Sequence, residues 1–354
     1  MATLVDWGWD ARWAEAFGDE AGRAPARVIE EQRGAYRVVC GDGEHAARIT
    51  GAQRHKSEAR ADLPAVGDWV AAERLPQDGT LVIRRVLPRR SKLSRKAAGE
   101  TTEEQLIAAN LDSVFVMTSL DADFNARRLE RFLTVCRESG AEPVVVLNKL
   151  DACADPLPFL GEARLVALSA PVVTISAKTG HGVEGLAAWI RPGRTVGCVG
   201  TSGVGKSTLI NRRLGAEKFK TAETRASDAR GRHTTTHRQL VLLPGGGVLL
   251  DTPGMREMQL WESDKGLAAA FDEIASLAPA CRFRDCGHDA EPGCAVKAAV
   301  ESGALDPARL ESFHKLKREA AFQARRVDEA AAAAKKKKDK AQSNSLKQHP
   351  RYKR

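Results

Sequence analysis

The stretch CVGTSGVGKSTLINRRLG, residues 198–215, decides the fold of this chain. Its segment GTSGVGKS has the pattern of a phosphate-binding loop, and the apolar run before it and the helical pattern after it supply the strand and helix that such a loop requires. Backbone N–H groups would surround a β-phosphate, Lys206 would reach the β- and γ-oxygens, and the Ser207 hydroxyl would coordinate magnesium. The candidate nucleotide-binding residues are Gly200, Thr201, Ser202, Gly203, Val204, Gly205, Lys206, Ser207 and Thr208.

A second motif, NKLD at residues 148–151, favours GTP over ATP. The Asp151 carboxylate can accept from N1–H and the 2-amino group of guanine, whereas adenine has an acceptor at N1 and would leave a polar group unpaired. Asn148 and Lys149 would brace the loop and the face of the base. Alone, the motif could equally be a turn at a strand end. SAKTG at 176–180 argues against chance, because it too follows an apolar run and can direct a backbone N–H at guanine O6. The candidates there are Ser176, Ala177 and Lys178.

Two further segments complete the parts of a GTPase, but in an unusual order. DTPG at 251–254 would supply Asp251 to the water shell of magnesium and the Gly254 N–H to the γ-phosphate, and GRHTTT at 231–236 would supply a switch threonine. Most GTP-binding domains begin with the phosphate loop and end with the guanine motif, whereas NKLD comes first here. Because domain termini often lie close together, joining them and cutting elsewhere preserves the site. We therefore predict a circularly permuted GTPase domain.

The segment CRFRDCGHDAEPGC, residues 281–294, has the composition of a metal site. It places three thiols and one imidazole in a C-x4-C-x-H-x5-C spacing, which suits a closed tetrahedral structural zinc site. Isolated buried cysteines are the alternative. The candidate zinc ligands are Cys281, Cys286, His288 and Cys294.

Apolar patterns divide the chain into regions of different type. Residues 26–86 contain five short β-type runs separated by turns, which suits a small closed barrel, most often of the oligonucleotide-binding type. From 111 to 251, apolar runs alternate with helical periods, as in a mostly parallel sheet covered on both faces. The predicted domains are an N-terminal extension (1–24), the barrel (25–98), the permuted GTPase domain (99–262), a helical zinc-binding domain (263–328) and a disordered basic tail (329–354).

Several helices can be placed from their caps and apolar periods. Asn125 should cap a helix whose apolar face carries residues at i, i+3, i+4 and i+7 from Leu129. Trp9, Trp13 and Phe17 indicate a short helix pinned onto a domain. Ser263 and Asp306 should cap two helices near the C-terminus, and the alanines of 329–334 should extend the second of them.

Composition sets the class of protein. With 354 residues, 43% hydrophobic and 29% charged, the chain suits a soluble protein of two or three domains. We expect it in the cytoplasm, because its first residues do not resemble a signal peptide and no apolar stretch of about 18 residues occurs. Seven cysteines, four of them scattered singly, argue against a disulfide framework. The last twenty residues contain nine Lys or Arg and one Asp, so this tail carries 9 − 1 = +8 of the net charge of +9.

Basic residues also gather around the barrel. Three lie in an expected loop and seven lie at the exit of the barrel segment, and they indicate either a solvated linker or a surface for the RNA backbone. Tyr36 and Trp69 are the few aromatic residues that could stack on bases there. The ten basic residues are Arg54, Lys56, Arg60, Arg84, Arg85, Arg89, Arg90, Lys92, Arg95 and Lys96.

With its barrel, permuted motifs and C-terminal cysteine and histidine spacing, the chain resembles the ribosome small-subunit-dependent GTPase A family of bacteria over about residues 25–320. The resemblance implies a late factor in maturation of the small (30S) ribosomal subunit, with the subunit and its 16S rRNA as partners and no membrane partner. It also implies GTP, Mg²⁺ and one structural Zn²⁺ as ligands, and hydrolysis of GTP to GDP and phosphate when the subunit stimulates it. We expect a monomer. A large-subunit GTPase, an RNA-binding protein that uses GTP only for occupancy, and a phosphate-loop ATPase or kinase remain the alternatives.

The resemblance also assigns roles within the switch segment. His233 becomes the candidate catalytic residue, and Thr235 the magnesium-binding threonine, with Thr234 and Thr236 still possible. Many GTPases orient the attacking water with a glutamine after DxxG, but Met255 stands there and cannot hydrogen-bond water. We therefore interpret His233 as its replacement, or else as a switch residue that packs against the ribosome.

Overall fold

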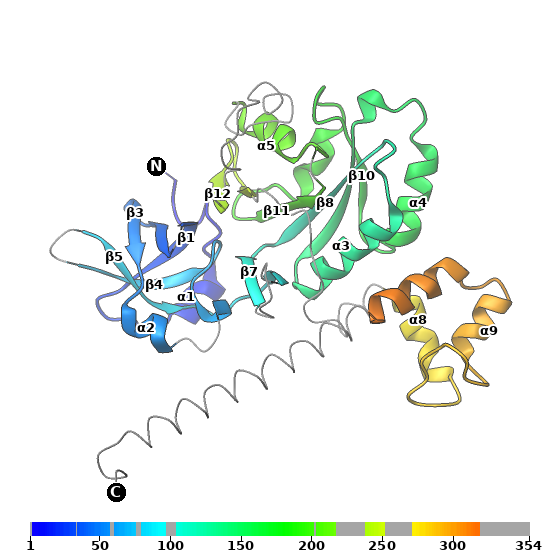
Figure 1. The fold of residues 1–354 in the computed structure, drawn as a ribbon. Helices are drawn as coiled ribbons and strands as arrows, with labels where there is room; N and C mark the ends of the chain where they lie inside the picture. Colours follow the sequence, from blue (N-terminus) through cyan, green and yellow to red (C-terminus); the bar gives the residue numbers. More distant parts are fainter. Residues whose placement is uncertain are drawn as a thin grey trace, which may run out of the picture.

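The computed structural model describes residues 2–32, 34–56, 60–75, 79–96, 104–201, 203–216, 238–251 and 271–318. Its N-terminal part is a closed five-stranded barrel, as predicted, with the pairing order β1-β2-β3-β5-β4 and β4 returning to β1 (Figure 1). Apolar side chains that alternate along these strands, such as Val28, Val38, Val70 and Ile83, fill its interior. The strands are β1 (Ala24–Gln32), β2 (Ala35–Cys40), β3 (Gly43–Arg48), β4 (Trp69–Arg74) and β5 (Leu81–Val86).

The segment after β3 is helical, although the sequence predicted a loop around Arg54. Helix α2 (Gly51–Lys56) begins after Thr50, whose hydroxyl accepts from the Gln53 N–H, while the Gln53 side chain accepts from the Thr50 N–H. This reciprocal pair is a capping box, which satisfies donors at the start of the helix. A 3-10 turn, η1 (Arg60–Asp62), follows.

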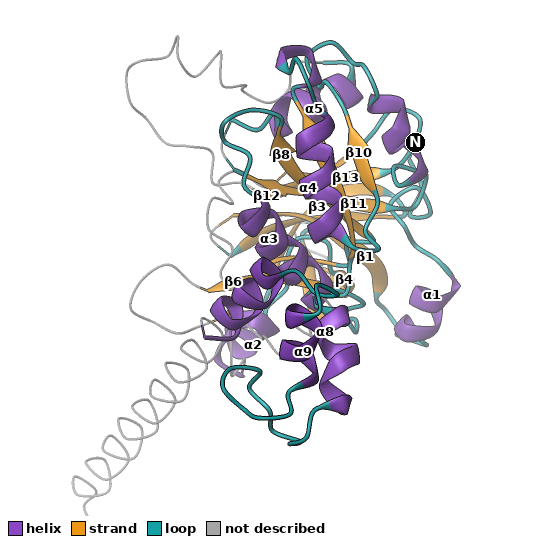
Figure 2. Ribbon diagram, turned by 90° about the vertical axis from the view of Figure 1, so that its right-hand side faces the viewer, coloured by secondary structure: helices purple, strands orange, loops and turns teal. Residues whose placement is uncertain are grey.

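The central region is a sheet in the order β10-β9-β8-β11-β13-β12, parallel except for β12, as predicted for an α/β domain. Helices α3 (Ala126–Glu138), α4 (Leu157–Ala167) and α5 (Lys206–Leu214) pack around it (Figure 2). The β11 strand lies in the middle, next to β8 and β13, although it comes late in the chain. The strands are β8 (Ser113–Ser119), β9 (Glu142–Asn148), β10 (Val172–Thr174), β11 (Thr195–Gly200), β12 (Arg238–Leu242) and β13 (Val248–Asp251).

Helix α3 confirms the predicted cap and apolar face. The Asn125 side chain accepts from the Arg128 N–H at 2.8 Å, and Leu129, Leu133 and Cys136 are buried. The short helix α1 (Ala11–Phe17) is also confirmed, with Asp10 as its cap. Trp9, just before the helix, and Trp13 within it pack onto the barrel, where their rings lie 4.8 and 6.1 Å from the ring of Trp69.

Strand β12 joins the two regions into one sheet, which the sequence did not predict. It pairs with β13 on one side and with β1 of the barrel on the other, where Glu30 lies opposite Gln239 and Glu31 opposite Arg238. A separate hairpin, β6 (Lys92–Lys96) and β7 (Glu104–Ala109), spans the predicted domain boundary at residue 98. The barrel and the GTPase region therefore share main-chain hydrogen bonds.

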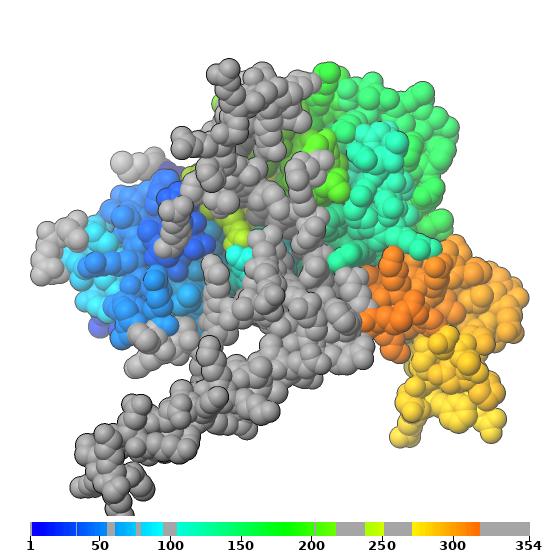
Figure 3. Space-filling view, viewed as in Figure 1, coloured from blue at the N-terminus to red at the C-terminus, as the bar shows by residue number. Residues whose placement is uncertain are grey.

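The C-terminal module, residues 271–318, packs against α3 and projects from the GTPase region (Figure 3). It consists of α8 (Asp272–Leu277), the 3-10 turn η4 (Ala278–Ala280), a loop, α9 (Ala295–Glu301) and helical residues 307–318. Asp306 caps the last helix as predicted, accepting from the Ala308 N–H at 2.8 Å. The predicted cap at Ser263 and the alanines of 329–334 lie outside the described residues. Within the described residues, no helix has both the length and the apolar character needed to span a bilayer.

Candidate nucleotide and metal sites

The phosphate-binding loop connects β11 to α5, as its sequence predicted. Lys206 begins the helix, and its ammonium donates to the carbonyls of Gly200 and Thr201 at 2.8 and 2.7 Å. Ser207 and Thr208 follow in the first turn. The loop thus lies at the carboxyl end of a central parallel strand, which is where doubly wound sheets bind ligands. Ser202 lies outside the described residues.

Asn148 connects the two motifs that the sequence proposed for phosphate and base. Its side-chain amide donates to the Val204 carbonyl at 2.7 Å, and its carbonyl accepts from the Ala177 N–H at 2.8 Å. The phosphate loop approaches so closely that a Cβ at Gly205 would lie 2.2 Å from Asn148 Nδ2, and Gly205 has a φ of +100°. NKLD, SAKTG and the phosphate loop therefore meet around one buried asparagine, despite their permuted order.

The Asp151 carboxylate, predicted to read guanine, is held from the SAKTG loop. Ser176, which is buried, donates through its hydroxyl to Asp151 Oδ1 at 2.6 Å and accepts from the Thr179 N–H at 3.0 Å. Asp151 itself is exposed at the start of the turn η2 (Leu150–Ala152). One carboxylate oxygen is thus fixed by the protein, and the side chain remains open toward solvent for a ligand.

Asp121 is a residue of this site that sequence reasoning missed. It accepts from the Lys149 ammonium at 2.9 Å, from the Ser119 hydroxyl at 2.7 Å and from the Asp123 N–H at 3.0 Å. Burial opposes ionisation, but these hydrogen bonds outweigh it and hold the pKa of Asp121 below its ordinary value. Lys149 itself has a left-handed backbone with a φ of 68°. The available signal was the position of Asp121 just after β8, at the same edge of the sheet as the motifs.

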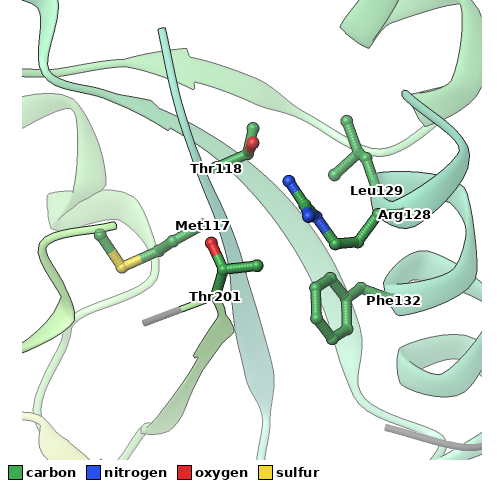
Figure 4. Close-up of a pocket in the computed structure, with 6 residues that line it drawn as sticks. All are labelled: Met117, Thr118, Arg128, Leu129, Phe132 and Thr201. Atoms are coloured by element: carbon green, nitrogen blue, oxygen red, sulfur yellow. The ribbon is translucent and has the colours of Figure 1, made fainter. Parts of the chain in front are cut away.

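A small hollow lies beside the phosphate loop, between β8 and α3. In Figure 4 the Arg128 side chain extends from α3 into the space that Thr118 and Thr201 border. The Arg128 guanidinium also donates to the Asp123 carbonyl. Thr201 therefore faces a cationic side chain. The lining residues are Met117, Thr118, Arg128, Leu129, Phe132 and Thr201.

The switch residues can be placed only in part. Asp251 ends β13, the neighbour of β11, so its backbone lies at the same sheet edge as the phosphate loop. The remaining predicted residues of the switch segments lie outside the described residues: His233, Thr234, Thr235, Thr236, Gly254 and Met255.

The four predicted metal ligands converge in the C-terminal module, and their ligand atoms all lie within 4.8 Å of one another. His288 Nδ1 lies 3.6 Å from Cys281 Sγ and 3.5 Å from Cys294 Sγ, and the two sulfurs are 3.9 Å apart. Tetrahedral zinc with Zn–S bonds of about 2.3 Å requires S···S edges of about 3.8 Å, so the donor set fits that ion.

Glu291 orders the loop that carries these ligands. Its carboxylate accepts from the Gly287 N–H at 2.7 Å and from the Asp289 N–H at 2.8 Å, on both sides of His288. Backbone hydrogen bonds lower the pKa of Glu291 to about 2. His288 has a left-handed φ of 64°, and the two hydrogen bonds to Glu291 hold the backbone on either side of it. No sequence pattern indicated this role, because an acidic residue between metal ligands is usually exposed to solvent.

Four arginines in and just after the last barrel strand are paired with acidic residues of the protein. Four of the predicted basic residues form ion pairs, of which the one to Asp68 is buried. These arginines hold the chain where it leaves the barrel, a role that neither sequence interpretation included. The pairs are Arg84 with Glu73 and Arg85 with Glu20 and Arg89 with Asp68, each at 2.7 Å, and Arg90 with Asp10 at 3.2 Å. The side chains of Lys56, Arg60, Arg95 and Lys96 lie outside the described part.

Comparison with known proteins agrees with this geometry. A family model described as RsgA GTPase matches residues 86–261. The "Small ribosomal subunit biogenesis GTPase RsgA" of Opitutus terrae is 49% identical over 341 residues, which cover 93% of each chain. The protein of the same name from Syntrophotalea carbinolica is 43% identical and covers 94% of each chain.

Solved structures show the same architecture. YjeQ from Thermotoga maritima is 28% identical, with a TM-score of 0.63, and the match covers 84% of this chain and 99% of that one. YloQ, described as a circularly permuted GTPase, has a TM-score of 0.62 at 22% identity, covering 86% and 98%, and supports the fold alone. The predicted barrel, permuted GTPase region and C-terminal metal-ligand cluster are thus confirmed as the fold. The chain belongs to the RsgA GTPase family and is a GTP hydrolase with circularly permuted motifs.

Proposed function

We propose that this protein binds the small ribosomal subunit late in its assembly, through 16S rRNA, and hydrolyses GTP when the subunit stimulates it. The observation that carries the proposal is the 93% coverage, at 49% identity, of a relative named as a small ribosomal subunit biogenesis GTPase. The nucleotide motifs that converge around Asn148 support the same proposal. Work on ribosomal subunits would place the protein in the cytoplasm.

The site residues divide into a base end and a phosphate end. Asp151, held by Ser176, would accept from guanine N1–H and the 2-amino group, while Lys178 would present its backbone N–H to O6 and Ala177, bound to Asn148, would hold the loop in place. The backbone of Gly200–Thr208 and the Lys206 ammonium would hold the β- and γ-phosphates. Ser207, Thr235 and Asp251 would hold magnesium, which supplies charge neutralisation at the bridging and terminal oxygens.

We propose that the C-terminal cluster holds one structural zinc ion. All four donors come from the protein, so the arrangement leaves no open position for a substrate. The role of the ion would be to stabilise a small module. The module in turn would place its exposed surface, including Arg282 and Arg284, beside the GTPase region.

The deciding experiment measures GTPase rate with purified 30S subunits, with 50S subunits and without either. An unaided GTPase of this type turns over slowly, because it lacks complete charge stabilisation and a fixed water. We expect strong stimulation by 30S alone, and co-sedimentation with 30S in a non-hydrolysable GTP analogue. Stimulation by 50S would instead indicate a large-subunit factor. No stimulation by either subunit would indicate an RNA-binding protein that uses bound GTP only as a signal of occupancy.

The catalytic role of His233 is a separate proposal. It rests on the absence of a glutamine after DTPG, where Met255 cannot orient water. His233→Ala should retain GTP affinity and 30S binding but lose about 10²-fold or more of the stimulated rate, as expected for loss of a positioned general base. A variant that binds normally and hydrolyses at the parent rate would reject the role.

A further inference from the structure

Helix α5 contacts both ends of the proposed nucleotide site. Its first residue is Lys206 of the phosphate loop, and six residues later Arg212 lies near its end. At 1.5 Å per residue the two positions are separated by about 9 Å along the helix axis. Arg212 therefore lies far from the phosphates and close to the SAKTG loop.

The Arg212 guanidinium holds that loop by its main chain. Nε donates to the Ala177 carbonyl at 2.6 Å, and Nη2 donates to the Lys178 carbonyl. Of these two residues, Lys178 is the one whose N–H is proposed to read guanine O6, because the Ala177 N–H is already donated to Asn148. Charged donors form stronger hydrogen bonds than neutral ones, and a planar guanidinium fixes two acceptors at once.

The loop leaves space for this side chain. Gly180, the last residue of SAKTG, has a φ of +95°, and a Cβ there would lie 2.7 Å from Arg212 Nη1. From the other side, Asn148 accepts from the Ala177 N–H. Ala177 is thus held by its N–H from NKLD and by its carbonyl from α5.

We propose that Arg212 is a specificity-determining positioning residue: by fixing the carbonyls of Ala177 and Lys178 it orients the Lys178 N–H toward O6 of the guanine base. The inference rests on the base assignment in the proposed function. Arg212 does not touch the ligand and acts only through the loop. Its removal should weaken recognition of the 6-oxo group and leave phosphate binding intact.

The test compares three diphosphates as competitors of a fluorescent GDP analogue on the full chain. GDP and IDP both carry O6, whereas ADP carries an amino group there and depends mainly on the phosphate loop. For Arg212→Ala we expect Kd to rise about tenfold for GDP and for IDP, with ADP unchanged, since one or two charge-assisted hydrogen bonds are lost. Arg212→Lys keeps the positive charge but cannot donate to two carbonyls in one plane. Its Kd values for GDP and IDP should therefore lie between those of the parent and those of Arg212→Ala.

Matched variants separate this role from general damage. Arg213→Ala removes the neighbouring positive charge on the same helix. The Arg213 Nε has no hydrogen-bond partner among the described residues, so all three Kd values should stay near those of the parent. An unchanged GDP Kd in Arg212→Ala, or an equal loss for ADP, would overturn the inference. Asp151→Asn should move preference toward xanthosine nucleotides. If it does so while Arg212→Ala has no effect, the base assignment stands and only the role of Arg212 fails; if it does not, the base assignment itself is wrong.

Discussion

The GTPase region has two neighbours, and it is joined to them in different ways. On the barrel side, β12 pairs with β1 through the main chain, and the buried Arg27 donates to the Trp7 carbonyl and to the Thr195 hydroxyl. On the other side, the C-terminal module meets α3 through side chains. There Arg309 forms ion pairs with Glu130 of α3 and Glu273 of α8, and Arg127 of α3 forms a third ion pair with the module.

Both junctions bury an arginine, and burial lowers the pKa of Arg27 and of Arg309 to about 10, so each remains a cation at neutral pH. Their partners differ. Arg27 donates to neutral carbonyls and to the hydroxyl of Thr195, a residue of the continuous sheet. Arg309 instead neutralises carboxylates. A sheet must unfold before its strands separate, but an ion pair between modules can open and become hydrated. The difference predicts one rigid body of barrel and GTPase region, with the module as a separable part.

The largest effect should come from removing the zinc ion that we propose for the C-terminal cluster. The module spans only 48 described residues, 271–318, and such small units depend on metal for their stability. Chelation, or Cys286→Ala, should remove on the order of 10 kcal/mol of coupled binding and folding free energy and unfold the module. Far-UV circular dichroism and hydrogen exchange would follow it.

The same experiment contains its own control. The barrel and GTPase region should keep their thermal transition and their GDP affinity after chelation. Loss of that transition together with the module would show that the two junctions are equally tight, and the comparison would then be wrong.

The next largest effect is expected for Arg27→Met. Methionine fills similar volume but leaves the Trp7 carbonyl and the Thr195 hydroxyl without a donor in a place where Arg27 is only 1% exposed. We expect a loss of about 3 kcal/mol in the free energy of unfolding. Urea denaturation should show barrel and GTPase region shifting together.

Arg37→Met is the matched control for Arg27→Met. Arg37 pairs with Glu30 and Glu44 on the surface of the same barrel, with a side chain 45% exposed. Its loss should cost less than about 1 kcal/mol. Equal losses in the two variants would contradict the importance of the buried junction.

A smaller effect is expected for Arg309→Met. It leaves the Glu130 carboxylate, in a residue only 2% exposed, without its cation, a situation that would cost about 3–5 kcal/mol if the charge stayed buried. The module can lift and let water reach Glu130, which limits the loss to the free energy of docking, about 2 kcal/mol. Limited proteolysis should become faster between the GTPase region and the module while zinc content is unchanged.

Arg127→Met sharpens the same test. Arg127 pairs with Glu311 at 2.8 Å across the same interface, but the side chains are 52% and 63% exposed. Exposed pairs contribute about 0–1 kcal/mol, so proteolysis should remain near the parent rate. A response as large as that of Arg309→Met would mean that burial is not what secures the module.

The sequence could predict the elements whose signal is local. The phosphate loop, NKLD and SAKTG each follow an apolar strand, and the Asn125 cap and the metal-ligand spacing lie within a few residues. The permuted topology also followed, because the carboxyl ends of parallel strands meet at one edge whatever the chain order. The matching architectures of YjeQ and YloQ confirm that step.

The missed features depend on contacts between distant residues. Arg27 and Thr195 are 168 positions apart, and Arg309 and Glu130 are 179 apart, so no local pattern could connect them. Arg85 and Arg89 carried a local signal, because they lie in a cluster of positive charge. Their partners Glu20 and Asp68, however, are distant in the sequence. Charge counted along the chain therefore could not show that these arginines pair with acidic residues of the folded protein.

The strand shared between barrel and GTPase region also affects how the protein can be divided. If the barrel were removed, β12 would become an open edge at Arg238 and Gln239, and unpaired edge groups promote association between copies. Light scattering on a fragment that begins after residue 86 should therefore show self-association that the full chain does not. In this fold the barrel would then also be a cover, which keeps the edge of the GTPase sheet from pairing with another copy.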